Sequence, residues 1–154
     1  MIEVTERETI ACEPRDWLEF VLDVERYAEV DDKIGPIRWS RRRGDVVEFK
    51  FRPRLPGVRL PEPCTTSRMR LVAGERIDVR LAPLPRNALN RCAGLFRARF
   101  SAVAVDGGAE VTRMISFRFN PLLRGLFEPT LRRTLPASVR RELALAKRIL
   151  EDRR

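Results

Sequence analysis

The side chains able to do acid–base chemistry in this chain are few, because it contains no histidine. There is therefore no Ser-His-Asp or Cys-His pair, no histidine general base and no histidine metal ligand. The three cysteines, Cys12, Cys64 and Cys92, are widely spaced and form no CxxC pair. We expect them to be reduced thiols of a cytoplasmic protein. The sequence thus predicts no metal, no cofactor and no conventional catalytic residue.

Arg113 is the polar side chain with the most unusual predicted position. It shares its parity with the apolar residues Val111 and Ile115, so on a strand it would point inward unless a bulge intervenes. A buried charge must be paired. Glu6 and Glu8 share the parity of the apolar positions of the first predicted strand. We therefore predict an ion pair between Arg113 and one of these two carboxylates. A bulge that turns either residue to solvent is the alternative.

The formal net charge of +9 is unevenly distributed along the chain. Residues 1–33 hold eleven acidic and four basic side chains, and all but three of the 31 basic residues are arginine. Clustered arginine suits an anionic partner such as RNA, acidic lipid or a carboxylate ligand. The simpler interpretation, which we favour, is a solvated outer face of a sheet. The aromatic side chains of RRM-type surfaces are missing, which makes nucleic acid the less favoured partner.

The segments that would position these residues alternate apolar and charged side chains. Residues 47–52, 76–81 and 96–104 each have a period of two, typical of an antiparallel sheet with one buried face. The proline-rich segments 53–64 and 83–90 are predicted loops. They would either rim a cavity mouth or simply link strands.

The two ends of the chain predict helices. Pro14 is suited to the first position of a helix, in which Trp17 and Phe20 begin an apolar stripe. Near the C-terminus, Pro129 and Pro136 predict a short lead-in helix followed by a longer one of about five turns from about Pro136. Its basic amphipathic pattern also suits a membrane surface, but the apolar face of the sheet needs a cover, which favours core packing. No apolar run reaches the roughly 18 residues of a membrane span.

The opening of the chain resembles a known family. The matching residues are Ile2, Val4, Ile10, Ala11, Pro14, Trp17, Phe20, Asp23, Glu25, Arg26 and Tyr27. They resemble the START-like (SRPBCC) helix-grip superfamily, in particular bacterial polyketide cyclase/dehydrase and lipid-transport proteins. The resemblance covers the whole chain. Two departures are that Ala28-Glu29-Val30 stands where Pro-x-Trp often follows the tyrosine, and that no histidine or acid dyad suits cyclase chemistry.

The resemblance implies an α+β fold and a single domain over residues 1–154. A curved seven-stranded antiparallel sheet would surround a long C-terminal helix, with two short helices after the first strand. Such folds hold apolar molecules between sheet and helix. We expect a non-enzymatic cytoplasmic protein, monomer or weak homodimer, that binds a lipid-like or polyketide-like molecule. The alternatives are a polyketide cyclase/aromatase and an RNA- or ribosome-associated module that uses the arginines.

The predicted cavity residues come from the apolar faces of these elements. They are Trp17, Phe49, Phe51, Met69, Leu81, Phe100, Arg113, Phe117, Leu131, Leu135 and Val139. Glu6, Glu8 and Tyr27 are candidate polar groups in the cavity, and the same residues would have to supply an acid or base in a cyclase.

Overall fold

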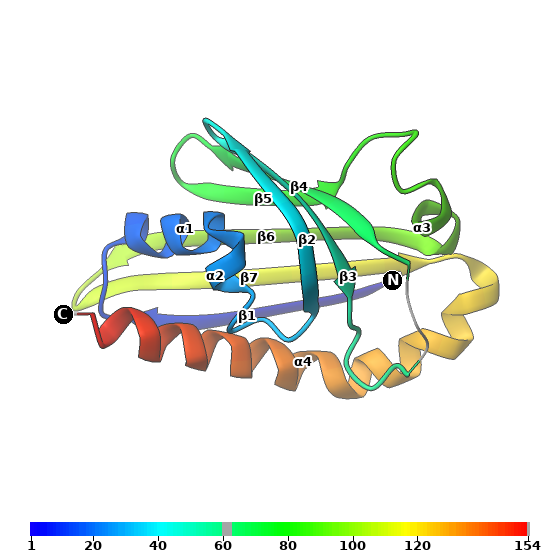
Figure 1. Cartoon of the computed structure of the whole chain (residues 1–154). Helices are drawn as coiled ribbons and strands as arrows, with labels where there is room; N and C mark the ends of the chain where they lie inside the picture. The colour runs from blue at the N-terminus through cyan, green and yellow to red at the C-terminus, as the bar shows by residue number, and fades with distance from the viewer. Residues whose placement is uncertain (60–62, 154) are drawn as a thin grey trace.

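The computed structural model describes residues 1–59 and 63–153 and contains one antiparallel sheet (Figure 1). Its strands are β1 (Ile2–Ile10), β2 (Ile34–Arg43), β3 (Val46–Pro53), β4 (Thr65–Val72), β5 (Arg76–Leu81), β6 (Gly94–Val105) and β7 (Gly108–Phe119). The order across the sheet is β1-β7-β6-β5-β4-β3-β2. Each strand is thus beside its neighbour in sequence except β1, which pairs with β7. The predicted seven-stranded sheet is confirmed.

Four helices accompany the sheet in the described part of the chain. They are α1 (Pro14–Leu22), α2 (Val24–Tyr27), α3 (Ala88–Ala93) and α4 (Pro121–Glu151). Figure 1 shows α4 running along β1, with α1 and α2 towards its C-terminal end and α3 near its start. The two short helices after β1 and the long C-terminal helix agree with the predicted helix-grip architecture. No helix among the described residues is long and apolar enough to cross a membrane.

The alternating segments become strands with one buried and one exposed face. On β3, for example, Val47, Phe49 and Phe51 are buried, whereas the residues between them are more exposed. The arginines take the other face. Arg80 of β5 is exposed and lies opposite the exposed Arg97 of β6. The outer surface of the sheet is therefore basic and its inner surface apolar.

The C-terminal segment differs from the prediction, because α4 is one helix of 31 residues that continues through Pro129 and Pro136. Figure 1 shows it changing direction in its first half, where these prolines lie. Each proline removes one helix hydrogen bond. The buried side chains of Leu131, Leu135 and Val139, on both sides of Pro136, pack in one apolar cluster with residues of β1 and β7, and this packing outweighs the lost bonds.

The two proline-rich segments behave differently from one another. In the first, Pro53 ends β3, and the described residues 54–59 and 63–64 belong to no helix or strand; the Thr134 hydroxyl of α4 donates to the Pro56 carbonyl at 2.7 Å. Residues 60–62 of this predicted loop lie outside the described part of the chain. Segment 83–90 leads into α3, which the sequence did not predict. None of the six residues of α3 is buried, so no apolar stripe marks it.

A glycine in β2 allows the close approach of β3. An ideal Cβ on Gly35 would lie 2.1 Å from the Arg52 carbonyl oxygen. We expect Gly35→Ala to lower the free energy of unfolding by about 1–3 kcal/mol, because one of the two strands must move. Urea denaturation measures this change. Gly125→Ala in α4 is the control, since its Cβ would meet nothing within 4 Å and alanine favours a helix by about 0.5–1 kcal/mol. Equal effects of the two substitutions would contradict the expected clash.

Candidate functional site

An apolar cavity of about 500 Å³ lies between the inner face of the sheet and the helices. Seven of the eight phenylalanines of the chain line it: Phe49, Phe51, Phe96, Phe100, Phe117, Phe119 and Phe127. They come from β3, β6, β7 and α4, which places aromatic side chains on several walls. A second hollow of about 510 Å³ between α1–α2 and β2 is lined mostly by charged side chains. The apolar cavity is the candidate site, because ligand sites are mostly apolar with a few polar groups.

The cavity has two chemically different ends. At one end it is lined by Leu89 and Leu95, both exposed, so this end is the mouth. At the other end lie Phe100 and Arg113, which pair across β6 and β7. Phe100 is six residues along β6 from Gly94, roughly 20 Å at the rise of a strand. A ligand would therefore enter between leucines and reach charged groups only at depth.

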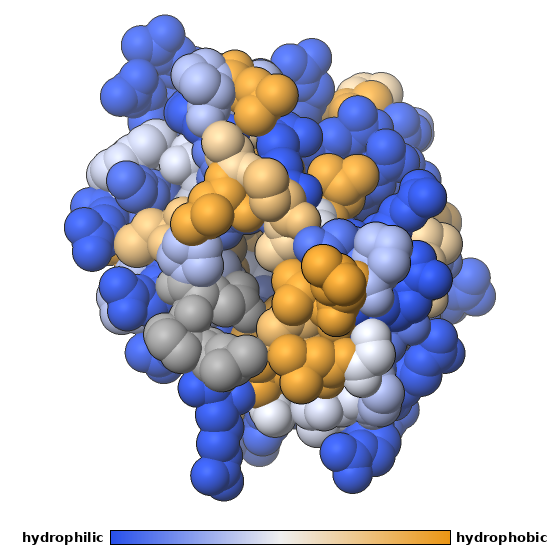
Figure 2. All heavy atoms as spheres, turned by 90° about the vertical axis from the view of Figure 1, so that its right-hand side faces the viewer, coloured by the Kyte–Doolittle hydropathy of each residue, from blue (hydrophilic) through white to orange (hydrophobic). Residues whose placement is uncertain are grey.

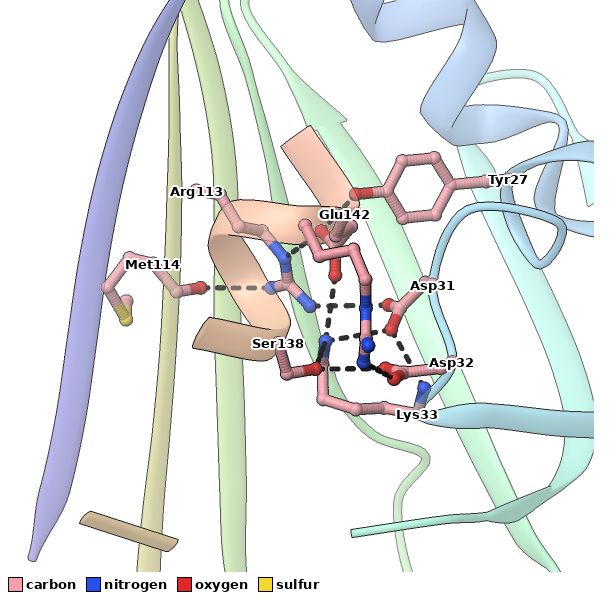
Figure 3. A network of polar contacts seen from close by, with 9 residues as sticks. Tyr27, Asp31, Asp32, Lys33, Arg113, Met114, Ser138 and Glu142 are labelled. Atoms are coloured by element: carbon pink, nitrogen blue, oxygen red, sulfur yellow. Dashed lines mark hydrogen bonds and ion pairs between the residues drawn. The ribbon is translucent and has the colours of Figure 1, made fainter. Parts of the chain in front are cut away.

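A cluster of five buried side chains forms the deep end (Figure 3). Glu142 of α4 accepts a hydrogen bond at 2.8 Å from Arg113 Nε, another at 2.8 Å from Lys33 Nζ, and one from the Tyr27 hydroxyl. Asp31, in the connection before β2, lies 2.8 Å from Lys33 Nζ and 3.5 Å from Arg113 Nη2. Four of the five side chains line the cavity: Tyr27, Asp31, Lys33 and Arg113. Glu142 does not line it, but its hydrogen bonds connect Tyr27, Lys33 and Arg113 to α4.

The charges of this cluster cancel. It contains two cations, Lys33 and Arg113, and two carboxylates, Asp31 and Glu142, and all four residues are buried. Arg113 also donates to the Met114 carbonyl oxygen at 3.1 Å and its guanidinium lies 4.2 Å from the centroid of the Phe100 ring. Burial of charge without a partner is costly, so mutual pairing is what allows four ionisable groups here.

The environment fixes which of these groups hold their protons. Burial, reinforced by the Glu142 carboxylate, raises the pKa of Tyr27 well above its ordinary value. Burial alone would lower the pKa of Lys33, but Asp31 and Glu142 outweigh it and the pKa is raised. Burial and the neighbouring Asp31 raise the pKa of Glu142. At neutral pH, Tyr27 and Lys33 are therefore protonated, so neither is ready to act as a base or nucleophile.

The two carboxylates of the cluster respond in opposite directions. For Asp31, burial raises the pKa, but the charges of Lys33 and Arg113 outweigh it, and the pKa is lowered. Two carboxylates that share a site typically split in this way, one taking up a proton before the other. Glu142 is thus the first of the pair to be protonated on acidification.

Ser67 is a polar residue of the cavity that the sequence analysis missed. It lies on β4, is buried and lines the cavity. Its hydroxyl has no hydrogen-bond partner among the residues that the structure describes. A buried hydroxyl without a partner is costly, and a polar atom of a ligand would satisfy it. No sequence signal marked Ser67, since serine on an apolar strand face is common.

Eight of the predicted residues line the cavity: Tyr27, Phe49, Phe51, Met69, Leu81, Phe100, Arg113 and Phe117. Four others are buried or packed elsewhere. Trp17 contacts Tyr27 and Phe100 in the core behind the cavity wall. Leu131, Leu135 and Val139 pack against the residues of β1 and β7. These three residues form the expected helical stripe, but it faces the part of the sheet that α4 covers and does not line the cavity.

The prediction that Arg113 pairs with Glu6 or Glu8 is wrong. The guanidinium is buried as expected, but it pairs with Glu142 and Asp31. Glu6 and Glu8 lie on the face of β1 that α4 covers, where they pair with Arg140 at 3.2 Å and Lys147 at 3.5 Å. Neither lines the cavity. Glu6 lies opposite Arg113 in the register of β1 and β7, but α4 supplies Arg140 and Lys147 to the two carboxylates of β1 and Glu142 to Arg113.

The comparisons with known proteins agree on the fold. No protein-family model and no curated protein sequence matches the chain. TTHA0849 from Thermus thermophilus has a TM-score of 0.73 at 11% identity, covering 96% of this chain and 95% of that one. The di-domain ARO/CYC StfQ from the steffimycin biosynthetic pathway has a TM-score of 0.73 at 16% identity; 99% of this chain is covered and only 51% of StfQ, so the chain spans about half of that protein.

A further solved structure, covered almost from end to end, leads to the same result. The Zhui aromatase/cyclase from Streptomyces sp. R1128 has a TM-score of 0.65 at 16% identity, covering 96% of this chain and 94% of that one. The sheet order, the two helices after β1 and the long α4 therefore form an architecture that these proteins share. The chain has the helix-grip fold of these aromatase/cyclases.

Proposed function

We propose that this protein binds a lipid-like or polyketide-like small molecule in the cavity between the sheet and α4. The observation that carries the proposal is the aromatic cavity of about 500 Å³, with an exposed mouth and a polar deep end. Burial of apolar surface would supply the affinity, about 25 cal/mol for each Å² removed from water. The Ser67 hydroxyl and the deep cluster would set the orientation of the ligand.

The chemistry of the deep cluster favours binding over catalysis. Tyr27 and Lys33 hold their protons and donate them in hydrogen bonds to Glu142, which accepts three such bonds. A cyclase would need a base that is free to take up a proton, or an acid that donates to the substrate. The aromatase/cyclases that share the fold make that activity the enzymatic alternative, and turnover abolished by one substitution at Tyr27 or Arg113 would support it. The RNA-associated alternative would instead show binding that weakens strongly with salt.

Native mass spectrometry of freshly purified protein tests the proposal directly. We expect a species heavier than the apoprotein, which loses a neutral apolar molecule on activation. The neutral fluorophore N-phenyl-1-naphthylamine should bind the delipidated protein, with a fluorescence increase that a displacing natural ligand reverses. A protein that retains no molecule and also fails to bind the fluorophore would contradict the proposal. The monomeric or weakly dimeric state of the protein and its cytoplasmic location are further predictions that this experiment does not address.

A further inference from the structure

Exposed leucines surround the mouth of the cavity. Leu89 of α3, Leu95 of β6, and Leu122 and Leu126 of α4 have 70%, 46%, 91% and 58% of their surface exposed, and we call these four residues the leucine rim. Figure 2 shows orange side chains gathered on this end of the molecule. Leu89 and Leu95 themselves line the cavity, and Leu123 and Phe127 next to the other two do so as well. Apolar groups gathered on one exposed face mark an interaction site.

The charge around the leucine rim is of one sign. The four rim leucines lie in two segments, residues 79–105 and 111–127, that contain no acidic residue, and Glu128, which follows on α4, is buried and pairs with the amino group of Met1. Arg118 lies opposite Leu95 in the sheet, and Arg124 lies between the two leucines of α4. Both arginines are exposed and form no ion pair with any described residue. The rim therefore combines leucine with unneutralised arginine.

This combination fits a membrane surface better than a protein. Leucine with arginine is the composition of interfacial segments, in which the apolar side chains enter the lipid and the cations contact anionic headgroups. Hot spots of protein interfaces also contain arginine, but it accompanies tyrosine and tryptophan there, and leucine is under-represented. No tyrosine or tryptophan occurs in the two mouth segments.

We propose that the leucine rim docks the protein on an anionic lipid bilayer, with the cavity mouth facing the acyl chains. Leu122 and Leu126 would insert below the headgroups, and Arg118 and Arg124 would contact phosphates. An apolar ligand could then pass between bilayer and cavity without crossing water. The role in ligand transfer rests on the proposed function, but docking itself needs no ligand and is measured separately.

Vesicle sedimentation tests the docking. Wild-type protein should sediment with vesicles of phosphatidylcholine and phosphatidylglycerol, and at least tenfold less with phosphatidylcholine alone. Leu122→Ser/Leu126→Ser should lower the affinity at least tenfold, since two inserting side chains are lost. Val103→Ser/Val105→Ser is the matched control, because these valines are also exposed but lie at the far end of β6. Thermal melts of both variants verify that they fold.

A second pair of variants tests the charge. Arg118→Gln/Arg124→Gln should remove most of the dependence on phosphatidylglycerol, whereas Arg133→Gln/Arg148→Gln, with the same change of charge elsewhere on α4, should not. Three results would overturn the proposal: no binding to the anionic vesicles, equal binding to both vesicle types, or equal losses of affinity in a rim variant and its control. The leucine rim would then be better explained as a binding site for another protein. Leu122→Ser/Leu126→Ser should bind the fluorophore as the wild type does when no vesicles are present, because neither leucine lines the cavity. A wild-type protein that binds vesicles but not the fluorophore would contradict the proposed function and leave the docking proposal standing.

Discussion

Glu142→Gln is expected to lower the free energy of unfolding by about 3–5 kcal/mol. The substitution keeps the shape of the side chain and removes its charge. Lys33 and Arg113, both buried, would then share only Asp31, and the deep end of the cavity would carry an uncompensated positive charge. Urea denaturation monitored by circular dichroism measures the loss.

The matched control is Glu6→Gln, which also removes a carboxylate between the sheet and α4. Glu6 pairs with Arg140, but its side chain is 24% exposed and that of Arg140 is 61% exposed. An ion pair with this exposure is worth less than about 1 kcal/mol. Similar losses in the two variants would mean that Glu142 is already neutral in the folded protein.

A double variant separates charge from geometry. Adding Lys33→Met to Glu142→Gln restores the balance of one cation and one carboxylate, Arg113 and Asp31. We expect the double variant to be more stable than Glu142→Gln alone, because an unpaired buried charge costs more than a lost hydrogen bond. A double variant that is less stable than either single one would contradict the charge argument.

Ala98→Phe should weaken binding of N-phenyl-1-naphthylamine at least about tenfold, equivalent to about 1.4 kcal/mol. Ala98 is buried on β6, lines the cavity, and lies between Val79 and Ile115 of the neighbouring strands. A phenyl ring at this position occupies the space that the fluorophore needs. Because the ring enters a cavity and not a filled core, the fold should be retained. Fluorescence titration measures the affinity.

Ala104→Phe provides the control for this experiment. Ala104 is on the same strand but is exposed and outside the cavity. Its substitution adds the same apolar surface without filling the cavity, so fluorophore affinity should stay within about twofold of the wild type. Unchanged affinity in Ala98→Phe would place the fluorophore elsewhere on the protein.

The sheet could be predicted from the sequence because its signal is local. Residues such as Phe49 and Phe51 alternate with charged neighbours, and this pattern alone sets which face is buried. The same parity correctly placed Arg113 inside. In contrast, α3 buries no residue and has no pattern to detect. The continuity of α4 depends on packing that compensates its prolines, which no local rule contains.

The deep cluster escaped prediction because its members are far apart in sequence. Lys33 and Glu142 are 109 positions apart, and Arg113 and Glu142 are 29 apart. One signal was nevertheless present. Glu142 falls at helical spacing between the apolar Val139 and Ala146, so a carboxylate interrupts a buried stripe. Such an interruption predicts a buried partner but does not identify it, since several cations were available.

The arginines at the end of β2 have a structural role that does not depend on a ligand, because β2 is an edge strand. The sheet is open, and β2 forms one of its two edges, whereas α4 runs along the other at β1. An open edge offers unpaired backbone groups to a second chain and invites aggregation. Arg41, Arg42 and Arg43 are exposed at the end of β2, where Arg42 pairs with Glu19 and the other two form no ion pair with a described residue. Exposed charge on an edge strand disfavours pairing with a second chain, so Arg41 and Arg43 help to keep the protein from polymerising through its own sheet.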